Sequence, residues 1–218
     1  ITSLLNFYGG LRIEQNNQHL DSYDKYNQPA NIKKDNLNFF PAANISYNMN
    51  EKNLLRFAYG ITINRPEFRE IAPFYFYNFQ EEADFVGNEN LKDAKIQNFD
   101  FRFERFPNNG EMISVGIFYK KFENPIELTY KPAGNRKNYT YENAREANNW
   151  GVEFDVRKSL SQIPLFSTVP VINDISIVAN AAYIFSKVLF YEGSIERDRA
   201  MQRSEEHTSE LQSRSDLV

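Results

Sequence analysis

The clearest pattern in this sequence is a strict alternation of apolar and polar positions. In residues 98–106, NFDFRFERF, aromatic side chains alternate with full charges. In residues 54–64, LLRFAYGITIN, one face of an extended strand carries Leu55, Phe57, Tyr59, Ile61 and Ile63. Soluble strands usually set an apolar core against a mixed surface, whereas strands of membrane barrels set an apolar lipid face against a polar lumen. The alternation therefore favours a membrane barrel.

The same period of two recurs along the chain and predicts seven strands, each about as long as a tilted strand needs to cross a bilayer. The predicted strands cover residues 5–14, 37–48, 54–64, 94–106, 112–122, 149–158 and 174–187. Two irregularities stand out: Pro41 requires a bulge or an unpaired edge, and Phe118 lies among polar residues on its strand. The predicted fold class is all-β, an antiparallel transmembrane β-barrel fragment.

The connections between these strands alternate in length. Short polar turns are predicted at residues 49–53 and 107–110, the latter with the sequence PNNG, which suits a hairpin. We expect long exposed loops at residues 15–36, 65–93 and 123–148, a connection of medium length at 159–173, and a polar segment from Tyr191. Outer-membrane barrels show this asymmetry, with short periplasmic turns and long outer loops.

Composition is consistent with this interpretation. The 218 residues are 41% hydrophobic and 15% aromatic, and no apolar run is long enough for a membrane-spanning helix. The mean hydropathy of -0.60 does not argue against a barrel, because every second residue of a barrel strand is polar. The formal net charge of -4 argues against a nucleic-acid partner. Because Ile1 follows no initiator Met or signal peptide, we expect an internal fragment.

Candidate chemistry is sparse. The sequence has no Cys, its two His are far apart, and it contains neither a Gly-rich phosphate loop nor a Ser/His/Asp grouping, so we expect no enzyme activity, no cofactor and no metal. The aromatic run within residues 74–79 is the candidate ligand contact, since flat rings bind sugars or chelates at low entropic cost. Packing of the loop against the barrel mouth is the alternative. The candidate ligand-contact residues are Phe74, Tyr75, Phe76, Tyr77 and Phe79.

Four segments carry a family resemblance: NRPEFREIAPF (64–74), GNENLK (87–92), PNNGEMISVGIFYKKFENPIE (107–127) and NNWGVEFDVRKSL (148–160). With them the chain resembles TonB-dependent outer-membrane receptors, most closely the large receptors of Bacteroidota-type bacteria. It departs from the family at Glu89, where the family often has Pro.

The resemblance implies the C-terminal β-barrel portion of such a receptor: about seven strands of a barrel of about 22, filled by a separate plug domain. It implies uptake of an iron chelate, cobalamin or glycan in the bacterial outer membrane, with membrane lipid, the plug, TonB and the ligand as partners. Charges such as Asp100, Arg102 and Glu104 are then expected to be solvated or in contact with the plug. A soluble or surface-attached β-sandwich binding module and a passive porin are the alternatives.

The end of the chain has a different character. Residues 203–213, RSEEHTSELQS, resemble the translation of a sequencing-library adapter. We therefore expect residues 1–202 to form the partial barrel and residues 203–218 to be an artefactual, disordered tail. A genuine polar tail with helical tendency is the alternative, and in neither case do we expect a metal site at His207.

Overall fold

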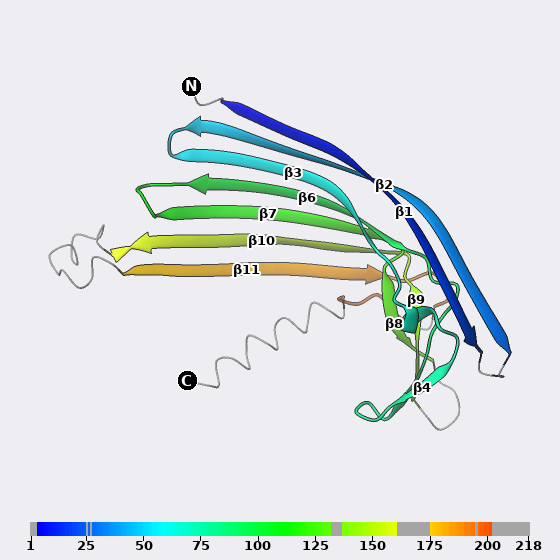
Figure 1. The fold of residues 1–218 in the computed structure, drawn as a ribbon. Coiled ribbons are helices and arrows are strands. Elements are labelled where there is room, and N and C mark those ends of the chain that lie inside the picture. The colour runs from blue at the N-terminus through cyan, green and yellow to red at the C-terminus, as the bar shows by residue number, and fades with distance from the viewer. Residues whose placement is uncertain are drawn as a thin grey trace.

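The computed structural model describes residues 4–24, 26, 28–131, 137–160, 175–194 and 196–201. These residues form a large curved antiparallel sheet and a small four-stranded sheet (Figure 1). The small sheet lies at one end of the long strands, inside the curve of β1 and β2. Within the described residues, no helix is long and apolar enough to cross a membrane.

The large sheet confirms the predicted series of antiparallel strands, with spatial order β1-β2-β3-β6-β7-β10-β11. Its strands are β1 (Leu5–Tyr23), β2 (Pro29–Asn50), β3 (Asn53–Asn64), β6 (Ala94–Arg105), β7 (Met112–Glu123), β10 (Glu146–Ser159) and β11 (Ser176–Leu189). Each strand pairs with the strand that follows it in this sheet, as in an up-and-down barrel wall. The sheet is open, with β1 and β11 as its edges.

The strand register places apolar residues opposite one another on all seven strands. One such row contains Phe7, Ile45, Phe57, Phe101, Ile117, Val152 and Tyr183. No second sheet covers this face within the described residues, so its side chains stay exposed, as in Phe101 with 45% of its surface accessible. The apolar outer face is therefore confirmed, and the two-sheet core of a β-sandwich is not what the chain forms.

The next row toward the small sheet is aromatic on five strands. It contains Tyr59, Phe99, Tyr119, Trp150 and Phe185. The rings of Tyr59 and Phe99 lie 4.8 Å apart, and those of Trp150 and Phe185 stack at 4.6 Å. Beyond this row the same face becomes polar, with Gln97, Lys121, Asn148 and Lys187 opposite one another. An aromatic row at the border of an apolar band is the arrangement of a membrane-interface girdle.

Both predicted short turns are present, at the end of the sheet away from the small sheet (Figure 1). The first joins β2 to β3 through Glu51 and Lys52. The second joins β6 to β7, and Gly110 takes a positive φ of 79°, which glycine adopts without strain. Pro41 lies where the pairing of β2 with β3 ends, because that ladder begins at Ala42 while Pro41 still faces Leu11 of β1.

The predicted loop at residues 15–36 is wrong. β1 and β2 continue through it as a paired hairpin, and their ladder runs to Tyr23 opposite Pro29. Side chains in this segment also point alternately to the two faces of the hairpin, but most of them are polar on both faces. The segment therefore shows little hydrophobic periodicity. The apolar pair Leu20 and Ile32 is the signal that could have revealed it.

The predicted loops at residues 65–93 and 123–148 are also wrong as structureless segments, because they fold together. The first supplies α1 (Phe68–Ile71), β4 (Tyr75–Asn78) and β5 (Ala83–Val86). The second supplies β8 (Ile126–Tyr130) and β9 (Lys137–Asn143). The four strands form the small sheet in the order β4-β5-β9-β8, with β5 and β9 parallel. We call α1 and this sheet the cap.

The predictions for the rest of the chain have mixed outcomes. Most of the predicted connection at 159–173 and the tail at 203–218 lie outside the described residues, so the division at residue 202 stays a prediction. The segment after Tyr191 returns to the sheet, where Arg199 bridges to Val188. Val188 belongs to a small core with Ala144, Ala147 and Phe190.

Candidate functional site

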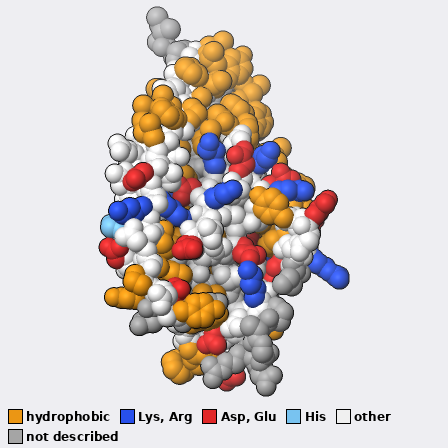
Figure 2. Space-filling model, turned by 90° about the vertical axis from the view of Figure 1, so that its right-hand side faces the viewer, with side chains coloured by type: hydrophobic (Ala, Val, Ile, Leu, Met, Phe, Trp, Pro, Cys, Tyr) orange, Lys and Arg blue, Asp and Glu red, His pale blue; other side chains and the backbone are white. Residues whose placement is uncertain are grey.

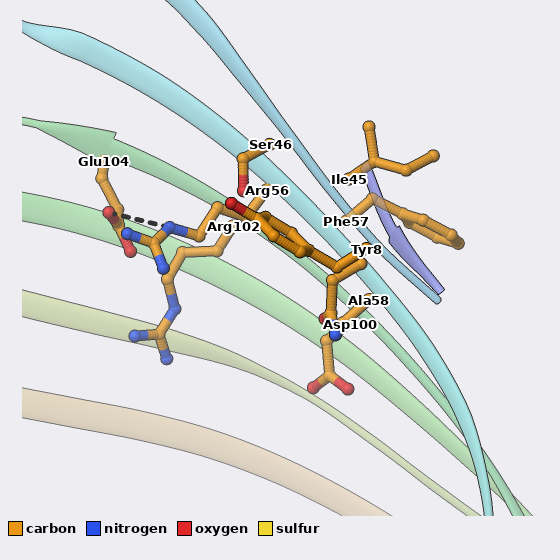
Figure 3. Close-up of a pocket in the computed structure, with 10 residues that line it drawn as sticks. Tyr8, Ile45, Ser46, Arg56, Phe57, Ala58, Asp100, Arg102 and Glu104 are labelled. Atoms are coloured by element: carbon orange, nitrogen blue, oxygen red, sulfur yellow. Dashed lines mark ion pairs between the residues drawn. The ribbon is translucent and has the colours of Figure 1, made fainter. Parts of the chain in front are cut away.

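The concave face of the large sheet carries a row of polar residues, on the opposite side of the sheet from the apolar row (Figure 3). Arg56 and Arg102 lie directly opposite each other on β3 and β6, an arrangement that is unfavourable for two like charges. Each arginine has its own carboxylate: Arg56 pairs with Glu104 at 3.3 Å, and Arg102 pairs with Glu153 of β10 at 3.0 Å. Both arginines are therefore neutralised by a carboxylate, while Asp100 of β6 adds a further negative charge to the wall.

A shallow hollow of about 470 Å³ lies on this wall. In Figure 3, Tyr8, Arg56 and Arg102 point to one side of the sheet, while Ile45 and Phe57 point to the other. This is the alternation that the sequence predicts. The prediction that Asp100, Arg102 and Glu104 share a strand face is also correct, since all three lie on the side of the sheet opposite Ile45 and Phe57 (Figure 3).

Phe118, the exception on the polar face, has a specific partner. It lies opposite Gly151 of β10, and a Cβ on Gly151 would come within 2.8 Å of the Phe118 ring. The ring therefore covers the glycine, which shields a stretch of backbone that has no side chain of its own.

The cap is anchored to the barrel wall by the residues of the first family-like motif. Arg65 binds Glu14 of β1 at 2.9 Å, and Gln18 donates to the Pro66 carbonyl at 3.4 Å. The carboxylate of Glu70 accepts from the Glu67 backbone N–H at 2.9 Å, which closes the start of the one-turn helix α1. The motif thus ties α1 to the extension of β1.

The GNENLK motif links the two long connections, residues 65–93 and 123–148, by hydrogen bonds. The Asn88 backbone N–H donates to the Glu70 carbonyl at 2.7 Å, and its side chain donates to the Tyr141 carbonyl at 2.9 Å. Gly87 passes so close to Ala72 that a Cβ would lie 2.8 Å from the Ala72 nitrogen and still closer to its oxygen. Only glycine fits there without a backbone shift.

Asn143, which belongs to none of the motifs found in the sequence, also links the two connections. Its side chain accepts from the Lys92 N–H at 2.7 Å and donates to the carbonyls of Lys92 and Asn124 at 2.9 and 2.8 Å. It therefore joins the end of the first long connection to the start of the second.

The extended β1–β2 hairpin packs onto the cap from the other side. Ile32 of β2 forms a buried cluster with Ile71 and Leu91. Lys34 donates to the Leu91 carbonyl, and partial burial lowers the pKa of its ammonium group, an effect that the nearby Asp93 carboxylate opposes. The hairpin and the two connections thus share one apolar core.

Arg199 holds the last described segment against the cap. Its guanidinium binds the buried Glu127 of β8 at 3.0 Å and donates to the Leu128 carbonyl at 3.2 Å. It also lies 5.4 Å from the centre of the Phe190 ring. The sequence offered no pattern that pointed to this residue.

The structure divides the five aromatic candidates into one packed residue and four exposed ones. Phe76 packs within the cap: its ring stacks on Phe85 at 5.3 Å, Phe85 stacks on Tyr139 at 5.2 Å, and Arg69 lies 4.2 Å from the centre of the Phe76 ring. The others are exposed, and Phe79 stands out with 84% of its surface accessible. The exposed members of the run are Phe74, Tyr75, Tyr77 and Phe79.

Tyr75 also faces a second, larger cavity of about 610 Å³. This cavity lies between the tip of the β1–β2 hairpin, at Asp24 and residues 29–31, and the cap residues Val86 and Thr140.

The charge on this end of the molecule is mixed. Figure 2 shows acidic and basic side chains interspersed over the end that carries the long connections, with the largest group of apolar side chains at the top of the view and smaller groups elsewhere. Among the described residues, no group of His, Asp or Glu side chains gathers closely enough to hold a metal ion.

A family model described as the outer membrane protein beta-barrel family matches residues 2–186. The chain belongs to this family. No curated protein sequence matches it. Family membership confirms the predicted outer-membrane location and barrel fold, and an outer-membrane barrel family is not a family of enzymes.

Solved structures with the same fold include receptors and a transporter. The siderophore receptor PirA from Pseudomonas aeruginosa is 15% identical with a TM-score of 0.60, and the match covers 89% of this chain and 44% of that one. The copper transporter OprC is 13% identical with a TM-score of 0.61, covering 86% of this chain and 28% of that one.

The Serratia marcescens hemophore receptor HasR is 12% identical with a TM-score of 0.51, covering 87% and 39% of the two chains. The chain thus spans less than half the length of each of these proteins. The predicted resemblance to receptor barrels is confirmed at the level of the fold.

Proposed function

We propose that this chain is part of a TonB-dependent outer-membrane receptor that takes up a bulky nutrient such as an iron chelate, cobalamin or a glycan. The barrel family and the fold shared with a siderophore receptor, a copper transporter and a hemophore receptor support this proposal. The proposed partners are outer-membrane lipid, a plug domain, TonB and the ligand.

The observation that carries the proposal is the folded cap. Two long connections and the β1–β2 hairpin share one buried cluster on the concave side of the sheet, at the end where barrels of this kind carry their outer loops. A capped mouth suits selective capture of a ligand, whereas a passive porin needs an open one. The aromatic run lies in and beside β4 of this cap, where Phe76 packs on Phe85. Its exposed members supply the proposed ligand contacts: Phe74, Tyr75, Tyr77 and Phe79.

The inner wall fits the proposed plug. Its two arginines are paired within the wall, Arg56 with Glu104 and Arg102 with Glu153, so a folded domain can lie against them without leaving either cation unpaired. Polar side chains such as Tyr8 and Ser46 remain to contact that domain.

Uptake by intact cells tests the proposal. The full-length receptor is expressed in a host that lacks its own receptors, with and without TonB, and accumulation of ferric citrate, cobalamin and labelled neutral oligosaccharides is measured. We expect accumulation of one of these probes to require both the receptor and TonB. Accumulation that is unchanged without TonB would identify a passive porin instead.

A further inference from the structure

The cavity beside Tyr75 is built from parts of the chain that are far apart in sequence. Its polar walls come from Asp24 and Asn31 at the hairpin tip, Glu89 in the first long connection, and Lys131 and Thr140 in the second. Its volume of about 610 Å³ is within the range of small-molecule sites. It therefore exists only when the hairpin is docked against the cap.

Tyr75 supplies a flat aromatic surface in this cavity. It has 47% of its surface accessible, whereas its neighbour Phe76 on the opposite face of β4 is stacked on Phe85. The face of an aromatic ring carries partial negative charge and attracts positively polarised hydrogens. The exposed ring thus suits a ligand that has an apolar C–H face.

The hydrogen-bonding groups around the ring are mainly acceptors. The side-chain amide nitrogen of Asn31 already contacts His19 at 2.9 Å and donates to Asp21, so its carbonyl oxygen is the group left for a ligand. Asp24 and Glu89 add two carboxylates. Asp24 Oδ1 accepts from the backbone N–H groups of Tyr26 and Gln28 at 2.8 Å each, so its Oδ2 is the oxygen for a ligand. The Lys131 ammonium is paired with Glu142 at 2.6 Å, so it is partly committed within the protein. The cavity therefore matches a ligand rich in donors.

We propose, on the basis of the function proposed above, that this cavity binds a neutral, hydroxyl-rich ligand of the saccharide class. A sugar ring offers a C–H face for Tyr75 and hydroxyl donors for Asn31, Asp24 and Glu89. Two carboxylates against one paired ammonium repel anionic chelates. Glu89, where this chain departs from the family pattern, supplies one of these acceptors.

Calorimetry on the purified full-length receptor tests this assignment. The probes are neutral malto-, xylo- and manno-oligosaccharides, ferric citrate as an anionic chelate, and spermidine as a cation. We expect one oligosaccharide to bind, Tyr75→Ala to weaken it about tenfold or more, and Tyr75→Phe to keep most of the affinity because the ring remains. Glu89→Gln, which keeps the shape and removes the charge, weakens binding by a smaller factor.

Two matched controls are available outside the cavity. Tyr191 has a similar exposure of 53%, and Glu81 is an exposed carboxylate of the β4–β5 turn, so Tyr191→Ala and Glu81→Gln leave the affinity unchanged. Preferential binding of ferric citrate or spermidine, binding of none of the oligosaccharides, or equal effects of Tyr75→Ala and Tyr191→Ala would each overturn the assignment. If ferric citrate or cobalamin is taken up in a TonB-dependent way but no oligosaccharide binds, the saccharide site is refuted and the proposed receptor function stands. If an oligosaccharide binds but uptake does not depend on TonB, the proposed receptor function is refuted.

Discussion

Arg102 on β6 and Glu153 on β10 form an ion pair of 3.0 Å that passes over an intervening strand. The residue between them in the register is Gly116 of β7, which faces Arg102 on one side and Glu153 on the other. Because Gly116 has no side chain, the side chains of Arg102 and Glu153 can meet above β7. Three strands are thereby linked on the polar face of the wall.

A large side chain at position 116 should break the ion pair between Arg102 and Glu153. In Gly116→Leu, the new side chain displaces the Arg102–Glu153 pair, and we expect a loss of about 1 kcal/mol, because the pair is partly exposed. Gly116→Ala is the control, since a Cβ there would lie 3.5 Å from Arg102 Nε, an ordinary contact. Urea unfolding of the full-length protein in lipid vesicles measures both variants. Equal stability of the Leu and Ala variants would contradict the role of Gly116.

The two faces of β6 should respond differently to charge. Phe101 lies in the apolar row, and Phe101→Arg in the full-length protein should cost about 2–4 kcal/mol near the bilayer midplane. Arg102→Gln on the polar face should cost no more than about 1 kcal/mol. Unfolding in vesicles compares them, and similar costs at both positions would refute the lipid-facing assignment of Phe101.

Gly87 should be essential for the cap but not for the wall. Gly87→Ala forces the backbone away from Ala72, and we expect a local destabilisation of about 1–3 kcal/mol from overpacking. Hydrogen exchange should rise in α1, β4 and β5 while the large sheet keeps its protection. Gly10→Ala is the control, because no atom lies within 4 Å of a Cβ at that position. Uniform loss of protection across both sheets would argue against an independent cap.

Glu111, in the β6–β7 turn, should make stability depend on pH. Its buried carboxylate lies 2.7 Å from Lys158, and the hydrogen bond from Lys158 is the main cause of its lowered pKa. A carboxyl whose folded pKa is lowered stabilises the fold above its ordinary pKa of 4.5, and this stabilisation is lost as pH falls through the folded value.

The variant Glu111→Gln removes this titration while keeping the side-chain shape. The difference in unfolding free energy between the native protein and Glu111→Gln should be constant near neutral pH and should shrink as pH falls below about 4.5. Urea unfolding over a series of acidic pH values measures it. A difference that stays constant down to the acid limit would show that the Lys158 contact does not set the pKa of Glu111.

The wall was predictable from the sequence because lipid and lumen impose a period of two on every strand. Residues such as Phe99, Phe101 and Phe103 carry that period without interruption. The hairpin extension was missed because most residues on both its faces are polar, and Leu20 and Ile32 form an isolated apolar pair. The cap was missed for another reason: the pairing of Phe85 with Tyr139 joins segments distant in sequence, and no local pattern encodes it. The aromatic run was identified, but its division between packing and exposed rings depends on that pairing.

The parallel pairing of β5 with β9 constrains the order of assembly. Ala83 meets Lys137 only after the chain has travelled the whole length of the sheet and back through β6 and β7. β4 can pair with β5, and β8 with β9, as local hairpins, but these two hairpins cannot meet until β6 and β7 are in place. The β5–β9 contact is therefore non-local and slow to form. The two hairpins of the cap can therefore join only after the wall between them has formed, so closure of the mouth is a late event in the maturation of the barrel.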